Sequence, residues 1–335
     1  MADIAFIDES GGRTLPGAGL EWLNAKRDAG RVRFGALGLP TPKLESWKYT
    51  RLRPLDDTKF APVSDDAGDT KIDKVPGLSG AAAKIVFVNG RLRMDLSKLD
   101  DLPDGVRFAS LESMLAEDPA WLEANMGKVA GDTPVRAGET GEQAMLALNE
   151  AMMDSGFILH VAKGVALSAP VEVVYIGGLT DDAVAYFPRN LIVLEENAQA
   201  TLVKQHIGHG VGEYFANAVT EISLKQGANF KHYKLQAESI YATHVTTLHA
   251  DIARDATYES FQLSIGGLLS RSESNITLSG EGAHAGVHGA YMMRGKEHCD
   301  NTTFIDMAVP HTTCNQVFKG VLDDESRAVF QGKLY

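Results

Sequence analysis

Apolar and polar residues alternate along much of the second half of the chain. Ile222 and Leu224 stand two positions apart, as do Phe261 and Leu263, with one polar residue inside each pair. Because successive side chains of a strand point to opposite faces, this period predicts strands with one buried face. Four stretches share a β-rich run, a polar turn with a small residue and a second alternating run: 191–206, 221–236, 247–264 and 275–292.

A turn alanine recurs in these stretches at a nearly constant interval. The residues are Ala198, Ala228, Ala256 and Ala283, so the steps are 30, 28 and 27 residues. A period of this length with little helical signal is typical of stacked two-strand coils, since one coil cannot bury its apolar face alone. An antiparallel sandwich also has short strands at regular intervals, but the lengthwise similarity of the repeats favours the solenoid. The pattern therefore predicts a mainly β chain built around a β-helix or a close relative.

The first 154 residues have a mixed, largely helical pattern, which separates an N-terminal region, 1–154, from the β-helix core, 155–335. We expect Gly30 to end the first helix. Asn89-Gly90 predicts a hairpin turn, and Asp118 fits the N-cap of a helix. The expected elements are helices at 17–29, 111–117, 119–126 and 142–153 and a strand pair at 84–89 and 91–94.

Composition narrows the class of protein. The chain has 335 residues, a net charge of −12 and no apolar run near the length of a membrane helix. Nucleic-acid binding is not expected, because phosphate contacts need a basic surface. The acidic N-terminus lacks the features of a signal peptide. Only two cysteines are present, which indicates a reducing compartment, so we expect a cytoplasmic protein.

All ten histidines lie after residue 159, and two of them stand near the cysteines. His298, Cys299, His311 and Cys314 could together hold zinc or a soft metal. Their spacing is not that of a zinc finger, and two cysteines cannot supply the four thiolates of a self-sufficient iron–sulfur cluster. Burial of each cysteine as a small apolar side chain is the simpler interpretation. P-loop, nucleophile-elbow and zincin motifs are absent from the sequence, so no complete active site is predicted.

Three stretches of the chain carry a distinctive sequence: PTPKLESWKYTRL at 40–52, PRNLIVLEENAQATLVKQH at 188–206 and the whole of 301–335. Together they resemble the SufB/SufD family of iron–sulfur cluster assembly proteins. The Trp-Lys-Tyr stretch at 47–49 favours the SufD branch over the SufB branch. The resemblance runs from about Leu20 to the last residue.

The resemblance implies a non-catalytic scaffold with a right-handed parallel β-helix between a helical N-terminal region and a C-terminal helical region. Family members of this branch pair with SufB through the β-helix and carry a SufC ATPase on their C-terminal helices. A transient iron–sulfur cluster is expected at the SufB–SufD interface, with no tightly bound cofactor in this chain.

The chain departs from the family at its end. It stops at Tyr335, before the family's Cys-Ser-His-Gly segment and C-terminal helices. We therefore expect a shortened chain that binds SufC poorly. Its last coils should borrow a strand edge from SufB or, without SufB, form a homodimer. The expected interface residues are Cys314, Gln316, Phe318, Phe330 and Tyr335.

Three alternatives stay open. A β-helix enzyme acting on carbohydrates would need clustered carboxylates, and Asp251, Asp255 and Glu259 are the nearest approach. A SufB-like paralogue would share the same core. A zinc or metal-storage protein could use the histidine-rich coils.

Overall fold

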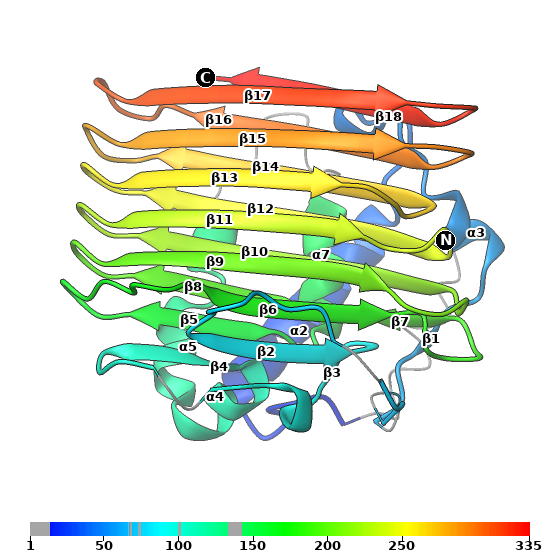
Figure 1. The fold of residues 1–335 in the computed structure, drawn as a ribbon, viewed down its shortest axis with the longest axis horizontal. Helices are drawn as coiled ribbons and strands as arrows, with labels where there is room; N and C mark the ends of the chain where they lie inside the picture. Colours follow the sequence, from blue (N-terminus) through cyan, green and yellow to red (C-terminus); the bar gives the residue numbers. More distant parts are fainter. Residues whose placement is uncertain (1–13, 66, 68, 73–74, 100–101, 133–142) are drawn as a thin grey trace.

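The structure is a computed structural model that describes residues 14–65, 67, 69–72, 75–99, 102–132 and 143–335. Two sheets face one another and the chain passes from one to the other in each coil, so that coils stack along one axis (Figure 1). Strands of successive coils pair in parallel, as in β10–β12 and β11–β13. The predicted β-solenoid is confirmed, and the antiparallel sandwich is excluded.

Within the described residues, one sheet has ten strands and the other has eight. The ten-stranded sheet contains β1 (Ala61–Pro62), β4 (Val106–Ser110), β5 (Phe157–Val161), β7 (Val184–Tyr186), β8 (Arg189–Leu194), β10 (Tyr214–Leu224), β12 (Ala242–Ile252), β14 (Leu269–Leu278), β16 (His298–Asp306) and β18 (Arg327–Leu334). The eight-stranded sheet contains β2 (Ala83–Val88), β3 (Arg91–Leu92), β6 (Val171–Gly177), β9 (Gln199–Gly208), β11 (Asn229–Ala237), β13 (Thr257–Ser264), β15 (His284–Met293) and β17 (Thr313–Leu322).

The repeated turn explains the nearly constant period. The residue before each turn alanine has a positive φ: Asn197 at 59°, Gly227 at 70°, Asp255 at 57° and Gly282 at 78°. Asn, Asp and Gly are the residues that adopt this left-handed conformation at least cost. The alanines that follow are fully buried, so a larger side chain would not fit beneath the corner. Each of these coils thus turns its corner with the same pair of residues, one with a positive φ followed by a buried alanine.

Helices of the N-terminal region cover the outer face of the ten-stranded sheet (Figure 1). The longest, α2, packs on α7, and Phe34 of α2 joins a cluster with Phe187 and Phe215 of the solenoid. The helices are α2 (Glu21–Leu37), α3 (Arg53–Asp57), α4 (Leu111–Glu117), α5 (Pro119–Asn125), α6 (Lys128–Asp132) and α7 (Ala144–Met152), with short 3-10 turns at Glu45–Trp47 and Met94–Leu96.

The prediction that Gly30 ends the first helix is wrong. The helix continues to Leu37, and Gly38, with φ of 67°, follows it. A Cβ at Gly30 would lie 2.7 Å from the Ala151 backbone nitrogen, so glycine here permits close approach of α2 to α7. The residue that resembled a stop signal is a packing residue.

The other N-terminal predictions are close to the structure. Asn89 and Gly90 have φ of 47° and 78° and join β2 to β3 in a hairpin. Asp118 accepts a hydrogen bond from the Trp121 backbone nitrogen and caps α5. Helix α4 has the predicted bounds, and α7 lies inside the predicted 142–153, of which residue 142 falls outside the described residues.

Strands of the N-terminal region also join the solenoid. Strand β2 pairs in parallel with β6, and β4 pairs antiparallel with β5, so both continue the two sheets at the end where α4 and α5 lie. A division into domains at residue 154 stays a prediction. No helix within the described residues is long and apolar enough to cross a membrane.

Candidate functional site

The interior of the solenoid is apolar beside the turn alanines and polar farther along the strands. Phe230, Tyr258 and Ile222 belong to the apolar part, two to four residues from the corners. Farther from the corner, Lys204 and Lys234 lie next to each other on β9 and β11, both pointing inward. This polar part of the interior, which we call the polar interior, is the feature of the core that packing alone does not explain.

Hydroxyl groups from the opposite sheet hold the two lysines. Lys204 Nζ donates to Thr220 Oγ1 at 3.3 Å, and Lys234 Nζ donates to Thr246 Oγ1 at 2.9 Å and Ser272 Oγ at 3.0 Å. A small cavity of about 40 Å³ lies among them. Burial lowers the pKa of Lys204 to about 7, helped by the charge of Lys234, and burial lowers that of Lys234 to about 8. The ammonium groups therefore lose protons within the physiological pH range.

Two residues farther along the strands, the polar interior contains a cluster of His206, Glu238 and His244. One potential ligand atom from each lies within 4.8 Å of the others, and all three residues are buried. Among the described residues this is the group of histidine, cysteine and carboxylate side chains that converges in this way. This cluster is not among the metal ligands predicted from the sequence.

A signal for this cluster was present in the repeat. His206 and Gln236 both stand eight residues after a turn alanine, Ala198 and Ala228, and they are paired in the register of β9 and β11. Glu238 is two residues beyond Gln236. Numbering each residue from the turn alanine of its own coil would therefore have predicted that His206 lies close to Glu238.

The four predicted metal ligands do not converge. His298 and Cys299 are consecutive on β16 and therefore point to opposite faces. Cys299 points inward and is buried, with its Sγ accepting from Asn301 Nδ2 at 3.4 Å, and burial raises its pKa. His298 points outward, where Thr50 Oγ1 lies 2.9 Å from its Nε2.

The remaining two candidates lie elsewhere. His311 is exposed in the loop before β17, with φ of 60°. Cys314 is paired with Ala285 and packs against the apolar part of the interior, at a different position in the coil from Cys299. The structure thus places both side chains on the inner side of the solenoid, Cys314 near the turn-alanine corner and Cys299 near the other end of the strands.

The predicted interface residues gather on the last coil, β17 and β18. Cys314, Gln316 and Phe318 alternate along β17 on its inward side, and the Phe318 and Phe330 rings are 4.6 Å apart. The Tyr335 ring stacks on Phe304 at 4.9 Å. Each of β17 and β18 is the last strand of its sheet among the described residues, and Phe330 and Tyr335 are 44% and 57% exposed.

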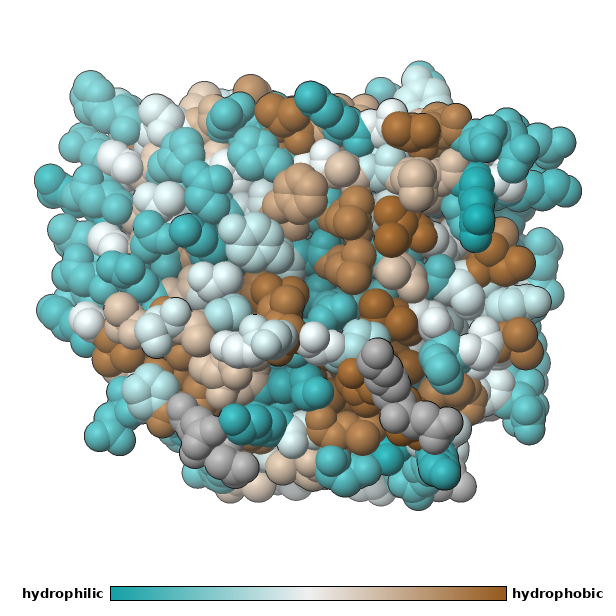
Figure 2. Space-filling view, in the orientation of Figure 1, coloured by the Kyte–Doolittle hydropathy of each residue, from teal (hydrophilic) through white to brown (hydrophobic). Residues whose placement is uncertain are grey.

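The outer face of the eight-stranded sheet carries an apolar band. Val203, Tyr233 and Phe261 are aligned in successive coils, and Met292 is aligned with Val321 farther along the strands. Figure 2 shows apolar side chains gathered across this face, which no helix covers in Figure 1. The band reaches the last coil at Val317 and Val321, which are 44% and 63% exposed.

The Trp-Lys-Tyr stretch fixes the N-terminal region to the solenoid. Trp47 is buried, with the Arg271 guanidinium 3.9 Å from its ring centroid. Arg271 is itself paired with Asp300, and Thr50 donates to the same carboxylate. The motif therefore binds the outer face of β14 and β16.

The carboxylates proposed for a carbohydrate-active enzyme do not meet. Asp251 points outward from the ten-stranded sheet, whereas Glu259 points outward from the eight-stranded sheet, where it lies 3.1 Å from His284 Nε2. Asp255 occupies the turn between them. The three carboxylates line no common groove.

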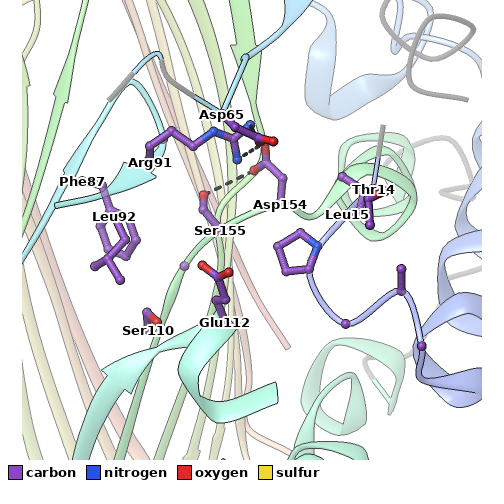
Figure 3. A pocket seen from close by; sticks show the side chains of 16 residues that line it. Thr14, Leu15, Asp65, Phe87, Arg91, Leu92, Ser110, Glu112, Asp154 and Ser155 are labelled. Atoms are coloured by element: carbon purple, nitrogen blue, oxygen red, sulfur yellow. Dashed lines mark hydrogen bonds and ion pairs between the residues drawn. The ribbon is translucent and has the colours of Figure 1, made fainter. Parts of the chain in front are cut away.

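A larger cavity of about 660 Å³ lies where the β2–β3 hairpin, the start of α4 and residues 14–19 meet (Figure 3). Arg91 points toward Asp65 and Asp154, at 3.7 Å and 4.0 Å. Asp154 Oδ1 also accepts from the Phe187 backbone nitrogen at 3.0 Å. Asp65 and Asp154 are thus engaged with Arg91, and Asp154 also with backbone, whereas Glu112 lines the same cavity on the side of α4.

Comparison with known proteins agrees with this architecture. A family profile described as "SufBD protein N-terminal region" matches residues 13–173, and one described as "SUF system FeS cluster assembly, SufBD core domain" matches 177–335. A protein of Synechocystis, iron–sulfur cluster assembly SufBD family protein slr0076, is 24% identical over 92% of this chain and 68% of its own length.

Two further relatives carry the names of the two branches. The Escherichia coli protein SufD is 25% identical over 88% of this chain and 65% of its own length. The Bacillus subtilis protein SufB is 25% identical over 68% of this chain and 47% of its own length. The chain therefore spans about two thirds, or less, of the length of these relatives. The two profiles together cover nearly every described residue, and the chain belongs to the SufB/SufD family.

Proposed function

We propose that the chain is a non-catalytic scaffold subunit in iron–sulfur cluster assembly that pairs with a SufB protein through its last coil. The observation that carries this proposal is the set of exposed apolar side chains on β17 and β18, among them Phe330 and Leu334. Both strands are at the end of their sheets among the described residues, and apolar side chains stand exposed beside them. Relatives of this chain are named as SufD and SufB, so the partner class is a second member of the same family.

Strands β17 and β18, the last of their sheets among the described residues, suit a partner that is itself a β-solenoid. An unpaired strand edge presents a row of N–H and C=O groups that another strand can pair with. The Phe318 and Phe330 rings and the exposed Leu334 would be removed from water in the same contact. A SufB solenoid with the same strand spacing would continue both sheets across the joint.

In this function the surface between the two subunits is where the iron–sulfur cluster is assembled. The transient cluster would form between the two subunits, with no cofactor tightly bound by this chain. A SufC ATPase would belong to the same assembly, held in family members by helices that follow the solenoid. Binding of SufC is therefore independent of the contact between the last coil and SufB.

The test is co-expression of the chain with the SufB protein of the same organism and capture through a tag on SufB. We expect capture of the parent and loss of at least about 90% of it for Phe330→Asp combined with Leu334→Asp, because a charge at the centre of an apolar contact is costly. Val32→Asp, at a position on α2 that is 75% exposed, is the matched control and should be captured like the parent.

Two outcomes would count against the proposal. Failure of SufB to capture the parent would overturn the pairing. Equal capture of the parent and the double variant would show that the joint lies elsewhere. Light scattering of the chain alone gives a further check, since concentration-dependent association that the double variant lacks is expected when SufB is absent.

A further inference from the structure

The cluster of His206, Glu238 and His244 is assembled from both sheets of the solenoid. His206 comes from β9 of the eight-stranded sheet, His244 from β12 of the ten-stranded sheet, and Glu238 from the turn that joins β11 to β12. His244 Nδ1 lies 2.9 Å from Glu238 Oε2. The cluster therefore spans the interior at the end of the strands away from the turn alanines.

The imidazole of His206 is held in place without a hydrogen bond. It stacks on Tyr175 with ring centroids 4.9 Å apart and an angle of 9°, and it meets His244 edge to face at 4.5 Å. Neither ring nitrogen of His206 has a hydrogen-bond partner among the described residues, and the same holds for Nε2 of His244. Buried polar atoms are nearly always satisfied, so these three nitrogens are available to a ligand inside the solenoid.

The carboxylate is oriented by its own partners. Tyr214 donates its hydroxyl to Glu238 Oε1 at 3.0 Å, and Gln236 Nε2 donates to Oε2 at 3.1 Å. Burial raises the pKa of Glu238, but His244, Gln236 and Tyr214 outweigh it and the net pKa is lowered. Burial also lowers the pKa of His206 well below its usual value. Tyr214 and Gln236 thus fix the Glu238 carboxylate so that Oε2 faces His244.

We propose that His206, Glu238 and His244 bind one divalent first-row transition-metal ion inside the solenoid. Two imidazoles and one carboxylate are a donor set that suits Zn²⁺, Fe²⁺ and Co²⁺, and Tyr214 and Gln236 act as the outer partners that orient the carboxylate. The remaining coordination positions would be filled by water. The site does not depend on a partner subunit or on the proposed scaffold function.

The two interior lysines are the charges that oppose a cation here. Their ammonium groups are engaged by Thr220, Thr246 and Ser272, so each Nζ is held toward hydroxyl groups of the opposite sheet. We expect an ion to enter through the turn that carries Glu238. Ile240 and Tyr241 in this turn are 58% and 37% exposed, so opening of one surface turn connects the cluster to solvent.

The experiment uses the chain freed of metal with a chelator and titrated anaerobically with Co²⁺, Zn²⁺ or Fe²⁺. We expect one equivalent of each ion to bind and to raise the unfolding midpoint, because an ion that binds the folded state stabilises it. Three separate variants test the ligands: His206→Gln, Glu238→Gln and His244→Gln. Each should bind the ion at least about 100-fold more weakly, because loss of a ligand should cost no less than loss of a residue that only orients a ligand.

Two controls separate this site from other histidines. His232→Gln changes a buried histidine of the same interior whose Nδ1 lies 3.1 Å from the Tyr258 hydroxyl, and it should bind the ion like the parent. The double variant His284→Gln with His288→Gln removes the pair around Glu259 on the outer surface and should also bind one equivalent.

The parent alone gives a second readout in case the interior variants do not fold. In the Co²⁺-loaded parent, ring N–H protons of two ligating histidines should appear as paramagnetically shifted NMR signals. Absence of stoichiometric binding would overturn the site, and so would two such signals that persist in a folded His206→Gln variant.

Discussion

Arg189 and Glu221 form a fully buried ion pair on the outer face of the ten-stranded sheet. Arg189 Nε lies 3.1 Å from Glu221 Oε1, and both side chains are 0% exposed. Glu221 also accepts from the backbone nitrogens of Gly127, at 2.8 Å, and Ala130, at 3.1 Å. The pair therefore connects strands β8 and β10 to the start of helix α6.

Glu221→Gln should destabilise the chain by about 3–5 kcal/mol, because removal of one partner leaves the other charge buried and unpaired. Chemical denaturation followed by circular dichroism measures this loss. Glu196→Gln is the control, since Glu196 pairs with Lys163 at a site where the side chains are 47% and 70% exposed, and exposed pairs contribute at most about 1 kcal/mol. Equal stability of the two variants would show that the buried pair contributes little.

Trp47→Ala should cost about 3–5 kcal/mol and loosen the segment around it, because the substitution removes a buried indole from beneath Arg271. Denaturation measures the cost, and limited proteolysis should detect cleavage near residues 39–60 at lower protease concentration. Trp47→Phe should cost less, since Trp47 Nε1 has no hydrogen-bond partner among the described residues to lose.

The neighbouring Tyr49 provides the control for this substitution. It is 60% exposed, so Tyr49→Ala should change the stability by no more than about 0.5 kcal/mol. A Trp47→Ala variant as stable and as protease-resistant as Tyr49→Ala would contradict the role assigned to Trp47.

The interior lysines should make stability rise with pH. Lys204 and Lys234 have pKa values of about 7 and about 8 in the folded chain and 10.5 as the ordinary value. Between these limits the unfolded chain binds more protons, so the free energy of unfolding increases with pH by up to about 1.4 kcal/mol per unit for each lysine. Below the folded pKa values the full penalty is present, and above the unfolded value it is gone.

Lys204→Met combined with Lys234→Met should flatten the rise in unfolding free energy from about pH 7.5 to about pH 9.5 and stabilise the chain at the lower pH. Denaturation curves at each pH, compared with the parent, measure the difference. Lys231→Met, at an exposed position of the same strand β11, should keep the slope of the parent. Identical slopes for the parent and the double variant would refute the assignment.

The corners and faces of the solenoid could be predicted from the sequence because their causes are local. Alternation fixes which side chains point inward, and the residue before each alanine, such as Asn197 or Gly227, fixes the turn. The cluster around Glu238 was missed because its members are brought together by stacking of coils, a relationship across about thirty residues. Reading His298 and Cys299 as co-ligands failed for the opposite reason, since neighbours on a strand diverge.

The contacts between the N-terminal region and the solenoid could not be predicted from the pattern of apolar and polar residues. Trp47 and Arg271 are more than two hundred residues apart, and neither shows from its surroundings that it will be covered by the other. Gly30 was predicted to end the helix because glycine has a low helix propensity, which is a local property. The close packing of α7 against Gly30 depends on the tertiary fold and could not be seen in the local sequence. The packing of the N-terminal helices on the solenoid depends on the surfaces of both folded regions, which a local sequence pattern does not describe.

The two ends of the coil stack are unlike within the described residues. Helices α4 and α5 lie near one end, where Leu111, Met114 and Leu122 bury their side chains with Ile158 and Leu191. Strands β17 and β18 are the last strands of the two sheets at the other end. A partner that adds strands to β17 and β18 would therefore approach along the axis of the stack, from the side farthest from those two helices.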